Sequence, residues 1–186
     1  MPRYLALLRG INVGGRNKVA MADLRLIAID LGYTDVATYI QSGNLLFASE
    51  GEDAAGHART LERRIAERLG VRPAVVVISA IDLARALADN PFPHVSNPRS
   101  LHAVFLDTEP TAAELARVAA EVRRARANGS ADDAVVVGRT LYLHTPAGFG
   151  RSGLAARLTA STARTAGPAR NWATVTRLMA LLTGAG

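Results

Sequence analysis

Apolar and polar positions along the chain fall into two successive rounds of short strand-like and helix-like segments. In the first round, four apolar runs are typical of buried strands: residues 3–8, 36–41, 45–48 and 75–78. Two segments space their apolar positions as core-facing helices do: residues 21–31 and 58–69. The resulting order of strand, helix, strand, strand, helix and strand predicts a ferredoxin-like βαββαβ arrangement.

The second round follows a short helix and a proline-containing break at residues 90–93. Its predicted elements are a strand (101–106), a helix opened by the capping-box pair Thr111 and Glu114, a hairpin (134–137 and 141–144), a short helix (154–158) and a last helix capped by Asn171. We therefore expect an α+β fold with a ferredoxin-like subdomain over residues 1–90. A smaller α+β subdomain is expected over residues 91–186. It ends in a C-terminal helix whose Trp172 is expected to be buried in the core.

The composition is that of a globular protein without thiol chemistry. The chain has 186 residues, 49% of them hydrophobic, and no cysteine. Disulfides, thiolate catalysis, zinc fingers and iron–sulfur clusters are therefore excluded. No apolar run approaches the roughly 20 residues of a membrane span, and the first apolar run is too short for a signal-peptide core. We expect a cytoplasmic protein with no membrane association, no metal and no cofactor.

The positive charge is concentrated at the two ends of the chain. The net charge is +6, and residues 151–186 hold 5 arginines and no acidic residue. At the other end, four basic residues precede the first acid, Asp23: Arg3, Arg9, Arg16 and Lys18. If the two ends meet in the fold, they form one positive surface that attracts phosphate or carboxylate groups. The alternative is a solvated basic face.

A glycine-rich loop at residues 10–17 is the first candidate anion site. Gly10, Gly14 and Gly15 have nearly the spacing of the phosphate-binding pattern G-x-x-x-x-G-K-[ST], but Arg16 and Asn17 replace its lysine and its hydroxyl residue. These replacements argue against an ordinary nucleotide hydrolase. Backbone N–H groups of Asn12, Gly14 and Gly15 can still converge on an anion. The alternative is a tight strand-to-helix loop without a ligand.

A second glycine-rich loop, at residues 148–153, precedes the predicted helix at 154–158. It matches G-x-G-x-x-G, but no acidic residue follows Asp133, so the ribose contact of a dinucleotide site is missing. An anion-binding turn that uses Arg151 and Ser152 remains.

The remaining candidates are ligand contacts and one acid or base. For each of them, a purely structural role in a turn, cap or strand is the alternative. The further candidate ligand contacts are Arg9 after the first strand, the turn residues Gln41, Ser42 and Asn44, and the pair Arg170 and Asn171 at the last helix. His144 is the candidate acid or base, because it lies on a strand just before the second glycine loop.

Five stretches resemble the bacterial family known as domain of unknown function 1697: YLALLRGINVGGRNKV at 4–19, TYIQSGNLLF at 38–47, NPFP at 90–93, LYLHTPAGFGRSGL at 141–154 and RNWATVTRL at 170–178. The resemblance implies an α+β fold with a ferredoxin-like N-terminal part, and it brings no established activity. The chain has Gly153 where the family usually has lysine, and Ala20 where proline is common. The anion contact that such a lysine would make is therefore missing.

These observations favour binding of a phosphate-bearing ligand, either a nucleotide or a nucleic acid, at a basic glycine-loop site. Two alternatives stay open: an enzyme that acts on a small anionic substrate with His144 as acid or base, and a protein-interaction module. The scarcity of aromatic residues on the first predicted sheet argues against base stacking of the kind that RNA-binding sheets use. The sequence leaves the oligomeric state undetermined.

Overall fold

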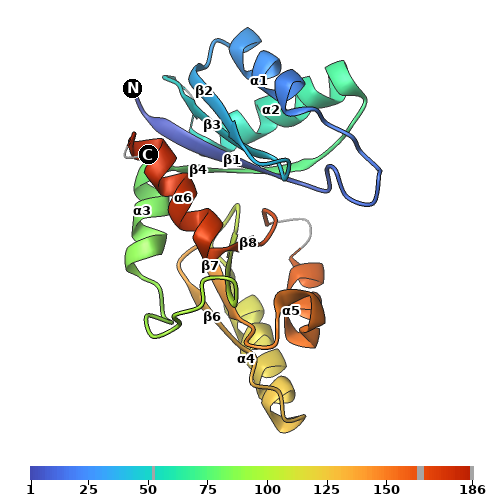
Figure 1. The fold of residues 1–186 in the computed structure, drawn as a ribbon, viewed down its shortest axis with the longest axis vertical. Helices are drawn as coiled ribbons and strands as arrows, with labels where there is room; N and C mark the ends of the chain where they lie inside the picture. The colour runs from blue at the N-terminus through green and yellow to red at the C-terminus, as the bar shows by residue number, and fades with distance from the viewer. Residues whose placement is uncertain (52, 163–165, 185–186) are drawn as a thin grey trace. The chain divides into compact units, whose positions relative to one another are not determined.

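The fold is of the α+β class that the sequence predicts. The computed structural model describes residues 1–51, 53–162 and 166–184. Over these ranges the chain forms two antiparallel four-stranded sheets and six α-helices, the last of them at the C-terminal end (Figure 1). None of these helices is both long and apolar enough to span a membrane.

The chain divides into two compact units, which are described separately. Unit 1 comprises Met1–Ala84 together with Leu178–Gly186, and unit 2 comprises Arg85–Arg177. The return of the C-terminal helix to unit 1 is marked by a hydrogen bond of 2.6 Å from Arg3 Nη1 to the carbonyl oxygen of Leu182. The subdomain boundary expected after residue 90 stays a prediction.

Unit 1 contains the elements of the first round in the order predicted. Its strands and helices are β1 (Arg3–Arg9), α1 (Met21–Asp30), β2 (Thr34–Tyr39), β3 (Asn44–Ala48), α2 (Ala54–Leu69), β4 (Ala74–Ser79) and the start of α3 (Ala80–Ala88). The strands pair in the order β2-β3-β1-β4. The order βαββαβ is thus present, and the more specific ferredoxin-like description stays an expectation.

Helices α1 and α2 bury their apolar faces against the unit 1 sheet. Leu24 of α1, Phe47 of β3, and Leu61 and Ile65 of α2 belong to one core cluster, and none of them is more than 1% exposed. Helix α2 is bounded by local signals: the Asp53 carboxylate accepts a hydrogen bond from Gly56 N at its start, and the left-handed Gly70 ends it. Burying four such side chains is a large part of what holds the unit together.

Unit 2 contains the second round and one strand that the sequence did not predict. Its elements are β5 (Leu101–Phe105), α4 (Ala112–Ala127), β6 (Asp133–Val137), β7 (Thr140–His144), the 3-10 helix η1 (Phe149–Arg151), α5 (Gly153–Ser161), β8 (Arg170–Asn171) and the start of α6 (Trp172–Thr183). The strands pair in the order β6-β7-β5-β8. Strand β8 has only two residues, too few to produce a periodic pattern.

The predicted capping residues make their hydrogen bonds at the starts of two helices, α4 and α6. Thr111 and Glu114 form the reciprocal capping box at the start of α4. Asn171 Oδ1 accepts a hydrogen bond of 2.9 Å from Thr174 N at the start of α6. Trp172 differs from its prediction: it is half-buried rather than part of the core, with its ring 6.1 Å from that of Tyr142.

Candidate functional site

The first glycine-rich loop folds into a small β-hairpin rather than an open cradle. Val13 and Arg16 form an isolated antiparallel bridge, and Arg16 N donates to Val13 O at 3.1 Å. Gly14 and Gly15 form the tip, with φ of 58° and 75°. Two successive positive φ values are those of a type I′ turn, which glycines adopt without strain. The sequence therefore located the loop correctly and left its hairpin form unpredicted.

Asparagine side chains fasten the base of this hairpin. Asn12 Oδ1 accepts from Val19 N at 2.9 Å, while Asn12 Nδ2 donates to Val19 O at 2.9 Å. Asn17 Nδ2 donates to Gly10 O at 2.8 Å. Both asparagines have positive φ, 54° and 48°, which asparagine tolerates better than most residues. These hydrogen bonds stabilise the base of the hairpin without a contribution from a ligand.

The turn between β2 and β3 packs directly against the base of this loop. Leu8 N donates to Gly43 O at 2.9 Å, and Asn12 Nδ2 donates to Gln41 O at 3.1 Å. Gly43 has a φ of 77°, and a Cβ atom placed on it would lie 2.7 Å from Ile11 Cδ1. Glycine is therefore favoured at this point, because the backbone conformation strains other residues and an added Cβ atom would force Ile11 to shift. Two loops that the sequence singled out separately meet here.

A shallow groove of about 370 Å³ opens between these two loops and the start of α1. It is lined by residues from all three segments: Asn12, Gly15, Lys18, Val19, Ala20 and Gln41. We call it the loop groove. Lys18 is its charged lining residue, and Arg16 lies exposed on the adjoining hairpin. Lys18 lies one residue beyond the phosphate-binding pattern, so the sequence assigns it only to the basic N-terminal end.

The N-terminus of α1 borders the loop groove. Its N-cap residue is Ala20, which offers no side-chain hydrogen bond to the first-turn N–H groups. The first N–H groups of a helix lack partners within the helix and carry partial positive charge, which favours anions. The Asp23 carboxylate in the same turn lowers this positive potential. The positive field of the loop groove therefore depends mainly on Lys18 and the neighbouring Arg16.

Two turn residues proposed as ligand contacts, Ser42 and Asn44, make hydrogen bonds within the turn itself. Asn44 is fully buried, and its Nδ2 donates to Tyr39 O at 2.9 Å and to Ser42 Oγ at 3.0 Å. These bonds close the turn between β2 and β3. Arg9 is half-buried at the end of β1, where it pairs with Ala74 of β4. Among the turn residues, Gln41 is the one that lines the loop groove.

In unit 2, the second glycine-rich loop leads into a helix cap. Ser152 is buried; its Oγ accepts from Ala155 N at 2.9 Å at the start of α5 and donates to Asp132 Oδ2 at 2.7 Å. Arg151 is exposed, and its Nε donates to Ala147 O at 2.8 Å. Both bonds of the Ser152 hydroxyl are thus made within the protein, whereas Arg151 extends the basic surface of unit 2.

Arg170 and Asn171 form the short strand β8 beside β5. Arg170 pairs with Ala103, and Asn171 pairs with His102. Arg170 is only 7% exposed, and burial lowers its pKa to about 10. Asn171 is the α6 cap described above. The predicted meeting of the two basic ends of the chain in one site stays a prediction.

The histidines occupy different environments. His144 is half-buried on β7 with its ring 5.7 Å from that of Phe92. His102 lies 4.3 Å, ring to ring, from Phe149 in the second glycine loop; burial lowers its pKa to about 4, and its Nδ1 has no hydrogen-bond partner among the described residues. His57 is buried in unit 1, where its Nδ1 shares a hydrogen bond of 2.9 Å with Tyr33 Oη.

Comparison with known proteins places the chain in a family without assigning an activity. The family model described as "Protein of unknown function (DUF1697)" matches residues 1–142. Among solved structures, the conserved bacterial protein SP0830 from Streptococcus pneumoniae is similar, with a TM-score of 0.73 and 24% sequence identity. The similarity covers 97% of this chain and 98% of that chain. At this identity the likeness concerns the fold alone. No functionally curated protein matches the chain.

Proposed function

This chain belongs to the DUF1697 family, and we propose that it binds a phosphate-bearing ligand, a nucleotide or a nucleic acid, in the loop groove of unit 1. The observation that carries the proposal is the meeting of two separate loops around one basic groove. Asn12 links them through its hydrogen bond to Gln41 O, and Lys18 lines the space between them.

The chemistry offered by the loop groove is that of anion recognition. Lys18 supplies a compact positive charge, Arg16 supplies a planar guanidinium group nearby, and the start of α1 supplies backbone N–H groups. Exposed cations of this kind attract phosphate through forces that salt screens. Binding is therefore expected to weaken as the salt concentration rises.

The same residues favour binding over hydrolysis of a nucleotide. The P-loop pattern uses a lysine on the phosphates and a Ser or Thr hydroxyl on magnesium, and this chain has Arg16 and Asn17 in those places. Asn17 is moreover engaged with Gly10 O through its side-chain amide. We therefore expect binding that does not depend on magnesium.

Titration calorimetry at low salt tests the proposal, with pyrophosphate, ATP and a short single-stranded oligonucleotide as probes. The variant Lys18→Ala removes the charge that lines the groove. Arg63→Ala is the matched control, because it removes the same charge from an exposed position on α2 outside the groove. The proposal requires Lys18→Ala to weaken binding by about fivefold or more, the upper range for one exposed ion pair, and Arg63→Ala to leave it nearly unchanged.

The probes also separate the two ligand classes. A steep loss of oligonucleotide affinity with salt indicates nucleic acid, because several phosphates release counterions together. Similar affinities for pyrophosphate and ATP, with a shallow salt dependence, indicate a small phosphate ligand. The double variant Arg16→Ala with Arg151→Ala tests whether the exposed arginines of the two glycine loops contribute to binding, and we expect it to bind the probes more weakly. If the parent protein binds none of the probes at low salt, the proposal is wrong and the protein-interaction alternative takes its place.

A further inference from the structure

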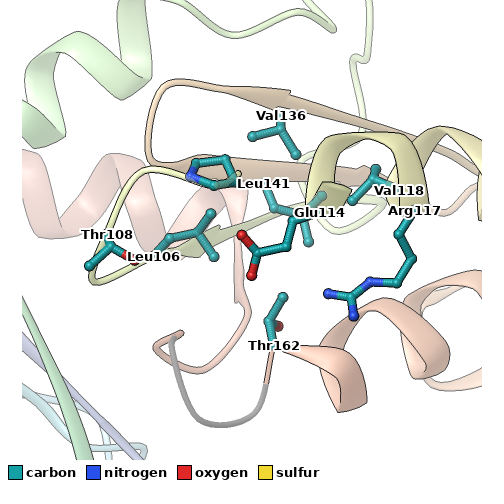
Figure 2. A pocket seen from close by; sticks show the side chains of 9 residues that line it. Leu106, Thr108, Glu114, Arg117, Val118, Val136, Leu141 and Thr162 are labelled. Atoms are coloured by element: carbon teal, nitrogen blue, oxygen red, sulfur yellow. The ribbon is translucent and has the colours of Figure 1, made fainter. Parts of the chain in front are cut away.

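A second groove, in unit 2, runs between helix α4 and the edge strand β6. One hollow of about 440 Å³ lies along most of α4 and is lined on the strand side by Asp133 to Val136. A smaller, more apolar hollow of about 30 Å³ continues it, and Val118 and Val136 line both. Figure 2 shows these two valines with Leu106 and Leu141 around the smaller hollow. The two hollows together form one groove, here called the α4–β6 groove.

The floor of this groove is apolar and open to solvent. Leu115, which lines the larger hollow, is 43% exposed. Val135 and Val136, which line it from β6, are only partly buried. A protein surface rarely leaves a row of β-branched residues on an edge strand unprotected, because such a strand pairs readily with another chain.

Among the strands that the structure describes, β6 has a neighbour on one side only. It pairs with β7, and the sheet order β6-β7-β5-β8 places it at the edge. Every second backbone N–H and C=O group of an edge strand points away from the sheet. An extended segment can therefore hydrogen-bond to β6 as a fifth strand, with alternate side chains facing the groove.

The charges along the groove select the sign of that segment. Arg123 lines the larger hollow and makes no ion pair or hydrogen bond within the described part of the chain. Arg117, also exposed, lines the smaller hollow. Arg126 is already neutralised by Asp133 at 2.7 Å. Glu114 lines the smaller hollow too and interacts electrostatically with Arg117, so the two charges offset each other there. Net positive charge therefore remains at the larger hollow, at Arg123.

We propose that the α4–β6 groove binds an extended acidic segment of a partner protein, which adds as a strand to the outer edge of β6. The segment places a small aliphatic side chain in the hollow beside Val136. Two residues away on the same face, an acidic side chain reaches Arg123 of α4, since residues i and i+2 of a strand share a face. This binding is independent of the loop groove of unit 1.

A second copy of this chain fits the groove less well. Pairing of β6 with β6 across a two-fold axis would apply the same basic α4 face to both sides of the interface. The unpaired Arg123 of each copy would then add repulsion, because the acidic lining residues Glu114 and Asp133 already face Arg117 and Arg126. An acidic peptide removes that repulsion, so the observations favour it.

A synthetic seven-residue peptide provides the probe. Its sequence, threonine, glutamate, threonine, valine, threonine, glutamate, threonine, reads the same in both directions and so fits a parallel or an antiparallel approach. Fluorescence anisotropy at low salt measures its affinity for the full-length protein. Hydrogen exchange of the amides of residues 133–137 reports on strand pairing. Binding together with slower exchange in β6 is the expected result.

Matched variants on one helix test the charge argument. Arg123→Glu reverses a charge that lines the groove, while Arg124→Glu reverses the neighbouring exposed charge, which pairs with Glu121 and lies outside both hollows. We expect Arg123→Glu to weaken peptide binding by about tenfold. Reversing the charge removes the attraction of one exposed ion pair and adds a repulsion of similar size. Arg124→Glu should change the affinity less than twofold.

Four results would overturn the proposal. The first is absence of peptide binding at low salt, and the second is equal weakening by both variants. The third is a dimer, detected by sedimentation, in which the β6 amides exchange slowly without peptide. This result would assign the groove to a second copy of the chain. A peptide with lysine in place of glutamate should bind at least tenfold more weakly, and equal binding of that peptide would also contradict the assignment.

Discussion

Replacement of Gly43 by alanine tests the packing of the two loops that form the loop groove. The new Cβ atom would lie 2.7 Å from Ile11 Cδ1 and 3.0 Å from Leu8 Cβ, both inside van der Waals contact. Relieving such a clash in a packed region costs about 1–3 kcal/mol. The left-handed backbone, with φ of 77°, adds about 1–2 kcal/mol for a residue with a side chain. The expected loss in free energy of unfolding is therefore about 2–5 kcal/mol.

Gly14→Ala is the matched control for this prediction. Gly14 also has a positive φ, 58°, but an added Cβ atom there meets nothing within 4 Å. Both variants share the backbone strain and the reduced entropy of the unfolded chain. The difference between them, about 1–3 kcal/mol, therefore measures the clash alone. Urea unfolding followed by circular dichroism gives both free energies. Equal destabilisation by the two variants would refute the close packing of the turn against Leu8 and Ile11.

The remaining predictions concern unit 2. Ser152→Ala removes the cap of α5 and leaves the buried Asp132 carboxylate without this donor, so the free energy of unfolding should fall by about 2–4 kcal/mol; a loss under 0.5 kcal/mol in urea unfolding would contradict these bonds. His102, whose pKa burial lowers from 6.5 to about 4, stays neutral in the folded protein while the unfolded chain takes up a proton. Stability should therefore fall as the pH drops from about 6.5 to about 4, and His102→Gln should reduce that fall. A ring titration midpoint near 6.5 in the NMR spectrum of the folded protein would show that the ring is solvated.

The fold follows from local patterns wherever the elements are long or carry caps. Apolar spacing places most of α2, although the helix begins at Ala54, before the predicted range of 58–69, because Asp53 caps it. The Thr111 capping box marks the start of α4. Strand β8 is different, because a two-residue strand exists only through its pairing with β5. Its formation depends on tertiary contact, which no periodicity in the sequence reports.

The candidate site could be predicted only in part for a similar reason. Glycine spacing located the first loop, but the same glycines serve an open phosphate cradle and a type I′ hairpin equally well. The hairpin is selected by the side chains of Asn12 and Asn17, which bond to backbone groups several residues away. The place of Lys18 beside Gln41 depends on the docking of two loops distant in sequence, which a single sequence does not reveal.

Whether the loop groove of unit 1 binds anions can be measured by following amide NMR shifts during a pyrophosphate titration without magnesium. The account predicts saturable shifts concentrated in three neighbouring segments: residues 12–18, residues 41–44 and the first turn of α1. The same titration of Lys18→Ala should require several-fold more pyrophosphate to reach half-saturation. Shifts that are absent at low salt, or that are spread evenly over the exposed arginines of both units, would contradict the account.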